Sequence, residues 1–237
     1  MARAVRLDQL RLRVTRAADI ESATARFTTT ELNDYINESA TELYDLIRAA
    51  YGQDYYRKTQ TFTTTGSTAT YNLASDFLDL ISVDIPLGGN LVLTAHPYME
   101  NERNLYKFFP FGAWTLNQPL WYRLTGAVDS TGTSAQTISF IPTPTGTYTV
   151  NVNYVPVPTL MVADADTFDG IAGWEQYVVV DAAMKCALKQ QNFELFNALS
   201  MMKEKMEQRI REMASEHDAG QAERVHDVYR DLAGVWW

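Results

Sequence analysis

The chain has 237 residues, 46% of them hydrophobic, so it can bury a sizeable core and is not a disordered tail. Its net charge of −9 argues against a protein that coats nucleic acid, because that affinity depends on Lys and Arg side chains that neutralise phosphates. The sole cysteine, Cys186, excludes an intramolecular disulfide, and the absence of a long apolar run leads us to expect neither a signal peptide nor a membrane span.

The first predicted helix covers residues 5–18 and carries a basic side. Leu7, Leu10 and Val14 lie on one helical face; an alternating strand pattern also fits this stretch, but its Arg, Leu and Gln content favours a helix. The first sixteen residues hold five arginines and one aspartate. The simplest interpretation of these arginines is a helix side that faces solvent or a partner. Contact with DNA is the alternative interpretation.

The second predicted helix begins at a capping box. Thr28 and Glu31 have the spacing at which a hydroxyl and a carboxylate satisfy each other's terminal N–H groups, and Gly52 follows where a left-handed terminator is expected. Between them, apolar residues recur every three or four positions: Leu32, Tyr35, Ile36, Ala40, Leu43, Tyr44 and Ile47. This pattern predicts a helix that packs along one side.

Residues 57–156 read as an inserted β region, because Thr, Ser, Tyr, Val, Gly and Pro replace the helix formers. We expect hairpin turns at Gly66-Ser67 and Gly88-Gly89, and a short helix within residues 98–107. The last strand alternates apolar with polar residues, with Tyr148, Val150, Val152 and Tyr154 on one side. About six strands of this length predict an antiparallel sandwich or barrel.

An irregular aromatic stretch, residues 108–121, interrupts these strands. Its large side chains lie among Pro and Gly and include Phe108, Phe109, Phe111 and Trp114. The simplest interpretation is a loop that plugs one end of the sheet. A protein contact, on the tail side of an assembly, is the alternative, because aromatic residues concentrate at interfaces.

Residues 167–190 predict the central helix, because this is the one long helical segment that is apolar on nearly every side. We expect Asp169 to cap its start. Four large side chains should form its buried core: Trp174, Tyr177, Val179 and Met184.

Asn192 should cap a last, long amphipathic helix that folds back antiparallel on the central one. Its apolar stripe comprises Leu195, Phe196, Leu199, Met202, Met206, Ile210 and Met213. The charged residues expected outside that stripe are Lys203, Glu204, Glu207, Arg209 and Glu212.

The predicted fold class is therefore α+β. Residues 1–56 and 157–216 should form a helical bundle, residues 57–156 an inserted β domain, and residues 217–237 an extended C-terminal tail.

No catalytic, metal or cofactor motif is apparent. The three histidines have no metal spacing, and there is no phosphate loop or nucleophile elbow. Asp164, Asp166 and Glu175 have the first, third and twelfth positions of a calcium loop, but Asp169 replaces the glycine that makes its turn. We expect no enzyme, no cofactor and no metal.

Three stretches resemble bacteriophage head-to-tail adaptor proteins. They are YINESATELYDLIRAAYGQDYY at residues 35–56, DTFDGIAGWEQYVVVDAAMKCALKQ at residues 166–190 and EHDAGQAERVHDV at residues 216–228. The resemblance implies a homo-oligomeric ring, a dodecamer, that joins the portal protein to tail or nozzle proteins and leaves a channel for the genome. It also implies a virion protein assembled in the host cytoplasm, with no catalytic residues and no specific DNA binding. The acidic balance suits such a channel, because a negative wall repels phosphate.

The C-terminal tail offers too few apolar residues for a core of its own: Val225, Val228, Tyr229, Leu232, Val235, Trp236 and Trp237. We expect them to be buried in a neighbour. The resemblance suggests the portal; an adjacent subunit or the chain's own bundle are the alternatives. From the residues alone, a soluble ligand- or carbohydrate-binding module that uses the aromatic stretch 108–121 also remains open.

Overall fold

The computed structural model describes residues 5–21, 26–52, 54–89, 91–104, 120–128, 134–168 and 173–217. The chain divides into two compact units. The helical unit comprises Met1–Gly52 and Pro158–Trp237, and the β unit comprises Gln53–Val157. The α+β class predicted from the sequence is confirmed, since helices and strands lie in separate segments of the chain.

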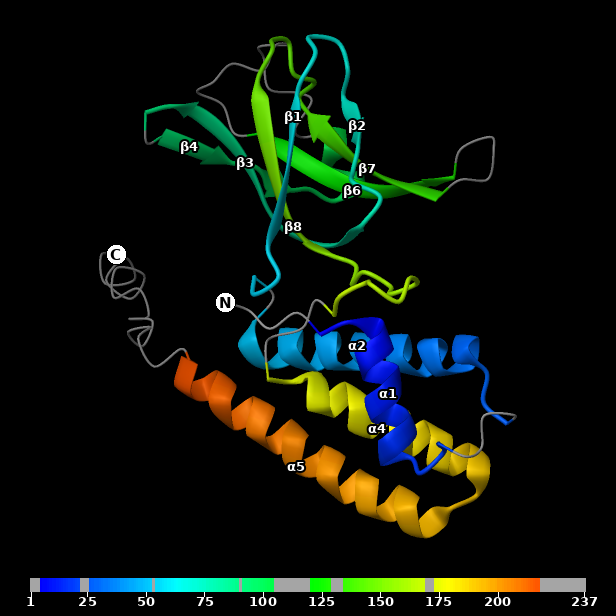
Figure 1. Cartoon of the computed structure of the whole chain (residues 1–237). Helices are drawn as coiled ribbons and strands as arrows, with labels where there is room; N and C mark the ends of the chain where they lie inside the picture. Colours follow the sequence, from blue (N-terminus) through cyan, green and yellow to red (C-terminus); the bar gives the residue numbers. More distant parts are fainter. Residues whose placement is uncertain are drawn as a thin grey trace, which may run out of the picture. The chain divides into compact units, whose positions relative to one another are not determined.

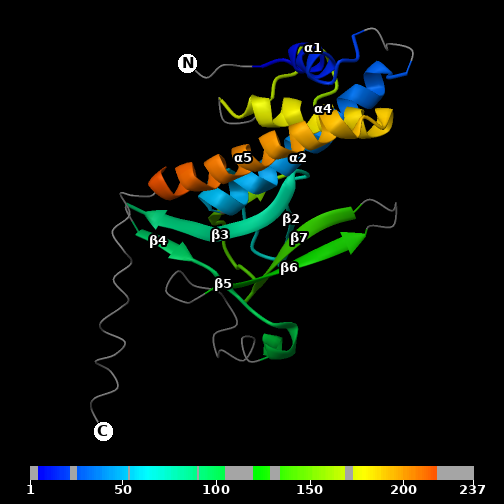
Figure 2. The same cartoon turned by 90° about the horizontal axis from the view of Figure 1, so that it is seen from below.

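Four α-helices of the described residues form the helical unit (Figure 1). They are α1 (Leu7–Ala17), α2 (Thr29–Tyr51), α4 (Glu175–Gln190) and α5 (Phe193–His217). Helix α4 contacts each of the other three, and it runs between α1 and α5 in the view of Figure 2. This central place explains its composition, because a helix with neighbours on several sides must be apolar on several sides.

Helix α2 begins and packs as its sequence predicts. The Thr28 hydroxyl accepts a hydrogen bond from the Glu31 backbone N–H at 3.2 Å, and Gly52 ends the helix with a φ of 101°. Leu32, Ile36 and other members of the apolar stripe are buried. Helix α1 is confirmed too, because its buried residues are those of the helical face and not of the strand pattern.

Helix α4 starts later than the sequence analysis expected. Its first residue is Glu175, and Trp174 stands at the cap position without a side-chain cap bond. The prediction of a helix from residue 167 is therefore wrong: Thr167 forms a β-bridge with Arg6. Gly173, at a φ of 111°, gives a physical reason, because this backbone conformation is incompatible with a helix.

Helices α4 and α5 are joined by a tight reversal. Gln191 ends α4 in the left-handed conformation, with a φ of 61°. The Asn192 side chain then accepts a hydrogen bond from the Leu195 N–H at 3.2 Å, which caps α5 as predicted.

The segment that precedes α4 is tied to α2 and α1. The Asn37 amide of α2 donates to the Met161 carbonyl and accepts from the Met161 N–H, both at 2.9 Å. Further along, the Leu7 N–H donates to the Asp166 carbonyl at 2.9 Å, and the Phe168 N–H donates to Val5 at 2.9 Å. Residues 161–168 are therefore held by two helices of the same unit.

The β unit contains two four-stranded sheets in orders β1-β8-β3-β4 and β2-β7-β6-β5. All pairs are antiparallel except β5 with β6, and the sheets do not close into a barrel. The strands are β1 (Lys58–Thr63), β2 (Thr70–Asn72), β3 (Phe77–Gly88), β4 (Leu91–Thr94), β5 (His96–Pro97), β6 (Trp121–Val128), β7 (Ser134–Ile141) and β8 (Thr149–Pro156). A single 3-10 turn, η1 (Glu100–Glu102), falls where a short helix was expected.

One of the two predicted hairpins is wrong. Strands β3 and β4 do pair around Gly88-Gly89, both at positive φ. Strands β1 and β2 do not pair with each other, because β1 pairs with β8 and β2 with β7. The turn at Gly66 passes the chain from one sheet to the other, and a Cβ there would lie 2.6 Å from the Thr145 carbonyl oxygen.

The two sheets share one apolar core. Phe62 of β1 stacks on Tyr71 of β2 with ring centroids 4.9 Å apart, and both rings approach Phe140 of β7. The fully buried members from β3, β7 and β8 include Val83, Ile85, Ile138, Phe140, Val150, Val152 and Tyr154. The alternation that predicted β8 thus places its apolar side chains in this core.

Candidate interaction surfaces

A cluster of charged side chains, here the Asp181 cluster, lies inside the helical unit. Asp181 of α4 is fully buried. Its carboxylate accepts hydrogen bonds from Ser39 of α2 at 2.6 Å and from Lys203 of α5 at 2.7 Å, and Lys185 of α4 lies 3.1 Å away. Glu42 of α2 completes the cluster, 3.0 Å from Lys203 and 3.2 Å from Lys185. The cluster therefore connects three helices.

The Asp181 cluster is charged at neutral pH. Burial alone would raise the pKa of Asp181, but hydrogen bonds from Lys203 and Ser39 and the charge of Lys185 hold it below the ordinary value. Burial would lower the pKa of Lys203, yet its bonds to Asp181 and Glu42 raise it. An ionised carboxylate and two ammonium groups thus satisfy one another in a site that would destabilise any one of them alone.

This cluster was not predicted from the sequence. Lys203 was expected outside the stripe of α5, whereas its side chain is only 19% exposed. A signal was present, because Asp181 is an acidic residue within the apolar run of α4. A buried carboxylate requires a cation, so this aspartate indicates that a neighbouring helix supplies a lysine or an arginine.

The residues proposed as the core of α4 differ in burial. Trp174, Tyr177 and Val179 are buried, and Met184 is half-buried. Tyr177 also contacts α5: its pKa is raised by burial to about 12, and its hydroxyl donates to Glu207 at 3.3 Å.

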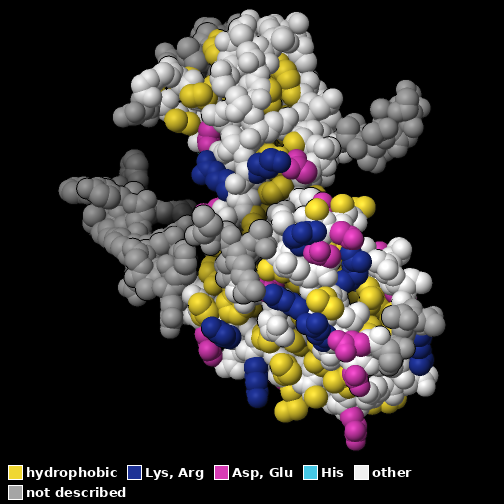
Figure 3. Space-filling model, viewed as in Figure 1, with side chains coloured by type: hydrophobic (Ala, Val, Ile, Leu, Met, Phe, Trp, Pro, Cys, Tyr) yellow, Lys and Arg dark blue, Asp and Glu magenta, His cyan; other side chains and the backbone are white. Residues whose placement is uncertain are grey.

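The arginines of α1 bind carboxylates of the same unit. Arg13 lies 3.9 Å from Glu175, Arg11 pairs with Asp164, and basic and acidic side chains lie side by side over α1 (Figure 3). Two further pairs, Arg6 with Asp8 and Arg16 with Glu21, are more exposed. Pairing of this kind explains the basic run without a nucleic-acid partner.

The carboxylates of the calcium-loop pattern have other contacts. Asp164 and Glu175 are the arginine partners just described, and Asp166 accepts N–H bonds from Val162 at 2.7 Å and Ala163 at 2.8 Å. These two bonds lower the pKa of Asp166. Within the described ranges, no three His, Cys, Asp or Glu side chains are grouped to hold a metal ion.

Several apolar side chains of α4 and α5 are exposed. Phe193 and Met201 are 61% and 62% exposed. Leu188, Met202 and Met213 are exposed as well. In the β unit, Leu91 and Val92 are exposed on β4, an edge strand of its sheet, and Met99 follows. Exposed methionines and apolar edge strands are typical of protein contacts.

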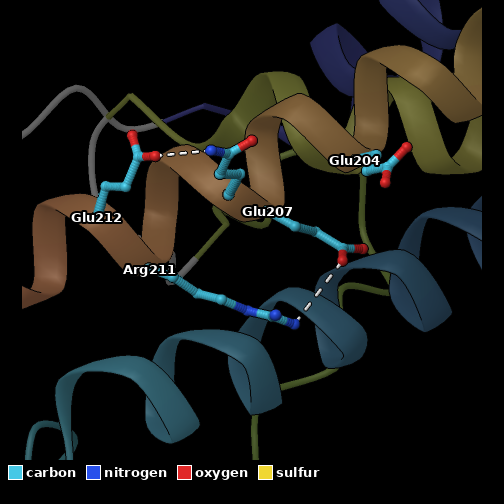
Figure 4. A pocket seen from close by; sticks show the side chains of 5 residues that line it. Glu204, Glu207, Arg211 and Glu212 are labelled. Atoms are coloured by element: carbon cyan, nitrogen blue, oxygen red, sulfur yellow. Dashed lines mark hydrogen bonds and ion pairs between the residues drawn. The ribbon is translucent and has the colours of Figure 1, made fainter.

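Two hollows open on the helical unit. One, of about 490 Å³, is lined by α5 residues: Glu204, Glu207, Gln208, Arg211 and Glu212 (Figure 4). The other, of about 570 Å³, is lined by Asp34, Asn37, Glu38, Thr41, Glu42 and Leu160. Both have acidic walls, and the Thr41 hydroxyl in the second donates to the Asn37 carbonyl of its own helix at 2.9 Å.

The remaining candidate contacts lie outside the described residues. They are the tail residues from Val225 to Trp237 and the aromatic residues Phe108, Phe109, Phe111 and Trp114. Among the described residues, no helix has the length and apolar character that crossing a membrane requires.

Comparison with known proteins identifies the family of the chain. No curated protein matches the chain. A family model described as SU10 adaptor protein matches residues 5–227, which span both the helical unit and the β unit. The expected resemblance is thereby confirmed, and the chain belongs to the SU10 adaptor protein family of bacteriophage head-to-tail adaptors.

Proposed function

We propose that the protein is a structural component of the virion, which joins the phage head to the tail as a homo-oligomeric ring, a dodecamer, between the portal protein and tail or nozzle proteins. The family match over residues 5–227 carries this proposal, because it includes every described residue. Ring subunits meet through two different faces around an axis, and exposed apolar surfaces on both units suit such contacts.

A ring subunit must hold one shape in every copy. The Asp181 cluster supports this requirement, because a buried ionic contact across α2, α4 and α5 is satisfied in one arrangement of the helices.

Passage of DNA through the ring requires weak attachment to its wall. The net charge of −9 supports a channel that does not retain phosphates, and the described arginines of α1 already bind carboxylates. The genome would therefore pass without specific binding.

The C-terminal segment is the proposed portal contact. It follows α5 and holds Val225, Val228, Tyr229, Leu232 and the terminal Val235, Trp236 and Trp237. A tryptophan can bury about 150–250 Å², so the terminal pair can anchor a segment on another chain. Repetition around a ring would strengthen the attachment, because later tails bind at high effective concentration.

Electron microscopy of the purified chain mixed with the portal protein of the same phage tests the function. We expect a ring stacked on the portal. A chain that stays monomeric and leaves the portal bare would contradict the proposal.

Deletion of Val235–Trp237 tests the tail. The shortened chain should melt at the wild-type temperature but fail to attach to portal-bearing heads. The double variant Trp236→Ala with Trp237→Ala is the control, because it removes the two aromatic side chains but keeps the length of the chain. Docking at full occupancy would exclude the tail, and a lowered melting temperature would show that the tail belongs to the subunit's own core.

A further inference from the structure

We propose that the Asp181 cluster fixes the register of α5 along α2 and α4, so that α5 is a helix with one permitted position among several that its apolar residues alone would accept. This role goes beyond the adaptor function, and it follows from contacts within the helical unit.

The apolar contacts of α5 do not specify its position. Within the described ranges, the buried or half-buried apolar residues along α5 include Leu195, Leu199, Met206, Ile210 and Ala214, which stand four or seven residues apart. A shift of one helical turn places Met206 where Ile210 was, so apolar again meets apolar. Only Leu199, Ile210 and Ala214 are buried, and such a repeat tolerates the exchange of similar side chains.

Lys203 breaks this repeat. It is the cation that α5 directs to Asp181, at 2.7 Å, and to Glu42, at 3.0 Å. A four-residue shift in one direction would bring Leu199 opposite Asp181 and leave the buried carboxylate with fewer partners. The opposite shift would bring Glu207 opposite Asp181 and place two carboxylates together. Both shifts are unfavourable because Asp181 is fully buried.

Among the other polar and charged side chains of α5, the exposed Arg209 also contacts the cap of α4, 5.5 Å from the Trp174 ring centroid, while others pair within α5. Figure 4 shows Gln208 bonded to Glu212, at 2.8 Å, and Arg211 paired with Glu207, at 4.0 Å, all on α5 itself. Glu207 does reach Tyr177 of α4, but at 3.3 Å and through a partly exposed side chain. A buried polar contact that selects one register is the best attested use of such groups in helical assemblies.

The register of α5 sets where the chain leaves the helical unit. One turn of an α-helix is about 5.4 Å, so a one-turn shift would displace the start of the C-terminal segment by that distance. This consequence rests on the proposed function of the segment as a portal contact, whereas the register itself does not.

Spin labels on α2 and α5 of the full chain test the register. Ala49→Cys and Gln208→Cys introduce exposed labelling sites, while burial raises the pKa of the native Cys186 thiol to about 11, which keeps it unreactive. The wild-type background should give one narrow distance. Asp181→Leu with Lys203→Leu should remain helical but add a second distance, displaced on the order of 5 Å.

Two further variants separate register from stability. Ile210→Ala weakens the packing of α5 but keeps the Asp181 cluster, so it should lower the melting temperature and retain one distance. Lys203→Met leaves Asp181 bonded to Ser39 and Lys185, and it should fold and show both distances even if the double variant does not. A single unshifted distance in Lys203→Met would overturn the proposal. Portal binding plays no part in this measurement, so the register proposal can fail while the adaptor function stands.

Discussion

The two units hold their elements in place by different means. In the β unit the core is apolar and aromatic, with Phe77 stacked on Tyr154 at 5.5 Å, and the position of each strand follows from backbone hydrogen bonds to its neighbour. In the helical unit each helix satisfies its own backbone, so side chains alone decide where one helix lies on another. The Asp181 cluster supplies that information. The β unit also contains a buried polar side chain, Asn153 of β8, which bonds to Thr59, Ser82 and Asp84. Its strands are nevertheless positioned by their backbones, whereas in the helical unit the buried polar contact itself decides the position.

The largest expected effect comes from placing a second aspartate in α4. Val179 is buried two residues before Asp181, and this spacing places it on the opposite side of α4 from the Asp181 cluster. Val179→Asp should abolish folding of the helical unit, because it buries a charge without partners. Circular dichroism should show the loss of helix. Val179→Ala is the control and should cost about 1–3 kcal/mol of unfolding free energy. A folded Val179→Asp variant would show that the partners of Asp181 are dispensable.

The apolar core of the β unit should be sensitive to volume. Phe140 of β7 is buried among residues of both sheets, so Phe140→Ala should cost about 3–5 kcal/mol. Hydrogen exchange should report the loss of protection in residues 53–157. Leu124→Ala, at an exposed position of the neighbouring β6, is the control and should change little. Equal loss of protection in the helices would show that the two units unfold together.

Acid should weaken the helical unit through Asp181. The pKa of this carboxyl is held below its ordinary value of 3.8, so its contribution to stability is present above pH 3.8 and is lost as the pH falls through the folded-state value. Urea midpoints measured from pH 6 downward should therefore fall more steeply for the wild-type chain than for Asp181→Asn. Parallel curves would mean that Asp181 is not ionised in the folded protein.

The smallest effect is expected from removing the β unit. Replacing residues 53–157 with a Gly/Ser linker should leave the helical unit folded, because the Asp181 cluster and the contacts of α4 lie within that unit. Its helical circular dichroism should persist with a cooperative melt. An unfolded remainder would show that the units depend on a common core.

Periodicity was sufficient where one face of an element is buried. The stripe of α2 identifies its buried side chains, because the spacing of apolar residues records the geometry of the element. The alternation of β8 identifies Val150, Val152 and Tyr154, but not Asn153 and Val155, which are buried on the other side of the strand. The start of α4 was not predicted, since a run of residues without proline does not show that Gly173 has a positive φ.

Contacts between segments far apart in the chain were harder to predict from the sequence. Threonine-rich β1 and β2 have the composition of a hairpin. The sequence does not show that β1 pairs with β8, 86–96 residues away, and β2 with β7, 65–69 residues away. Lys203 looked like a solvated lysine, because a charge on an amphipathic helix carries no mark of the buried carboxylate opposite it. The candidate contacts of the tail and of the aromatic stretch stay predictions.

The attachment of residues 161–168 has a mechanical consequence. The chain passes from the β unit back to the helical unit at Pro158. Three residues later, the Asn37 amide forms two hydrogen bonds with the backbone of Met161. The backbone bonds at Leu7 and Phe168 follow. A pull on this connection therefore loads the hydrogen bonds to Asn37 before any tension reaches α4. Helix α4 and the Asp181 cluster are therefore protected from force that enters the helical unit through residues 158–168.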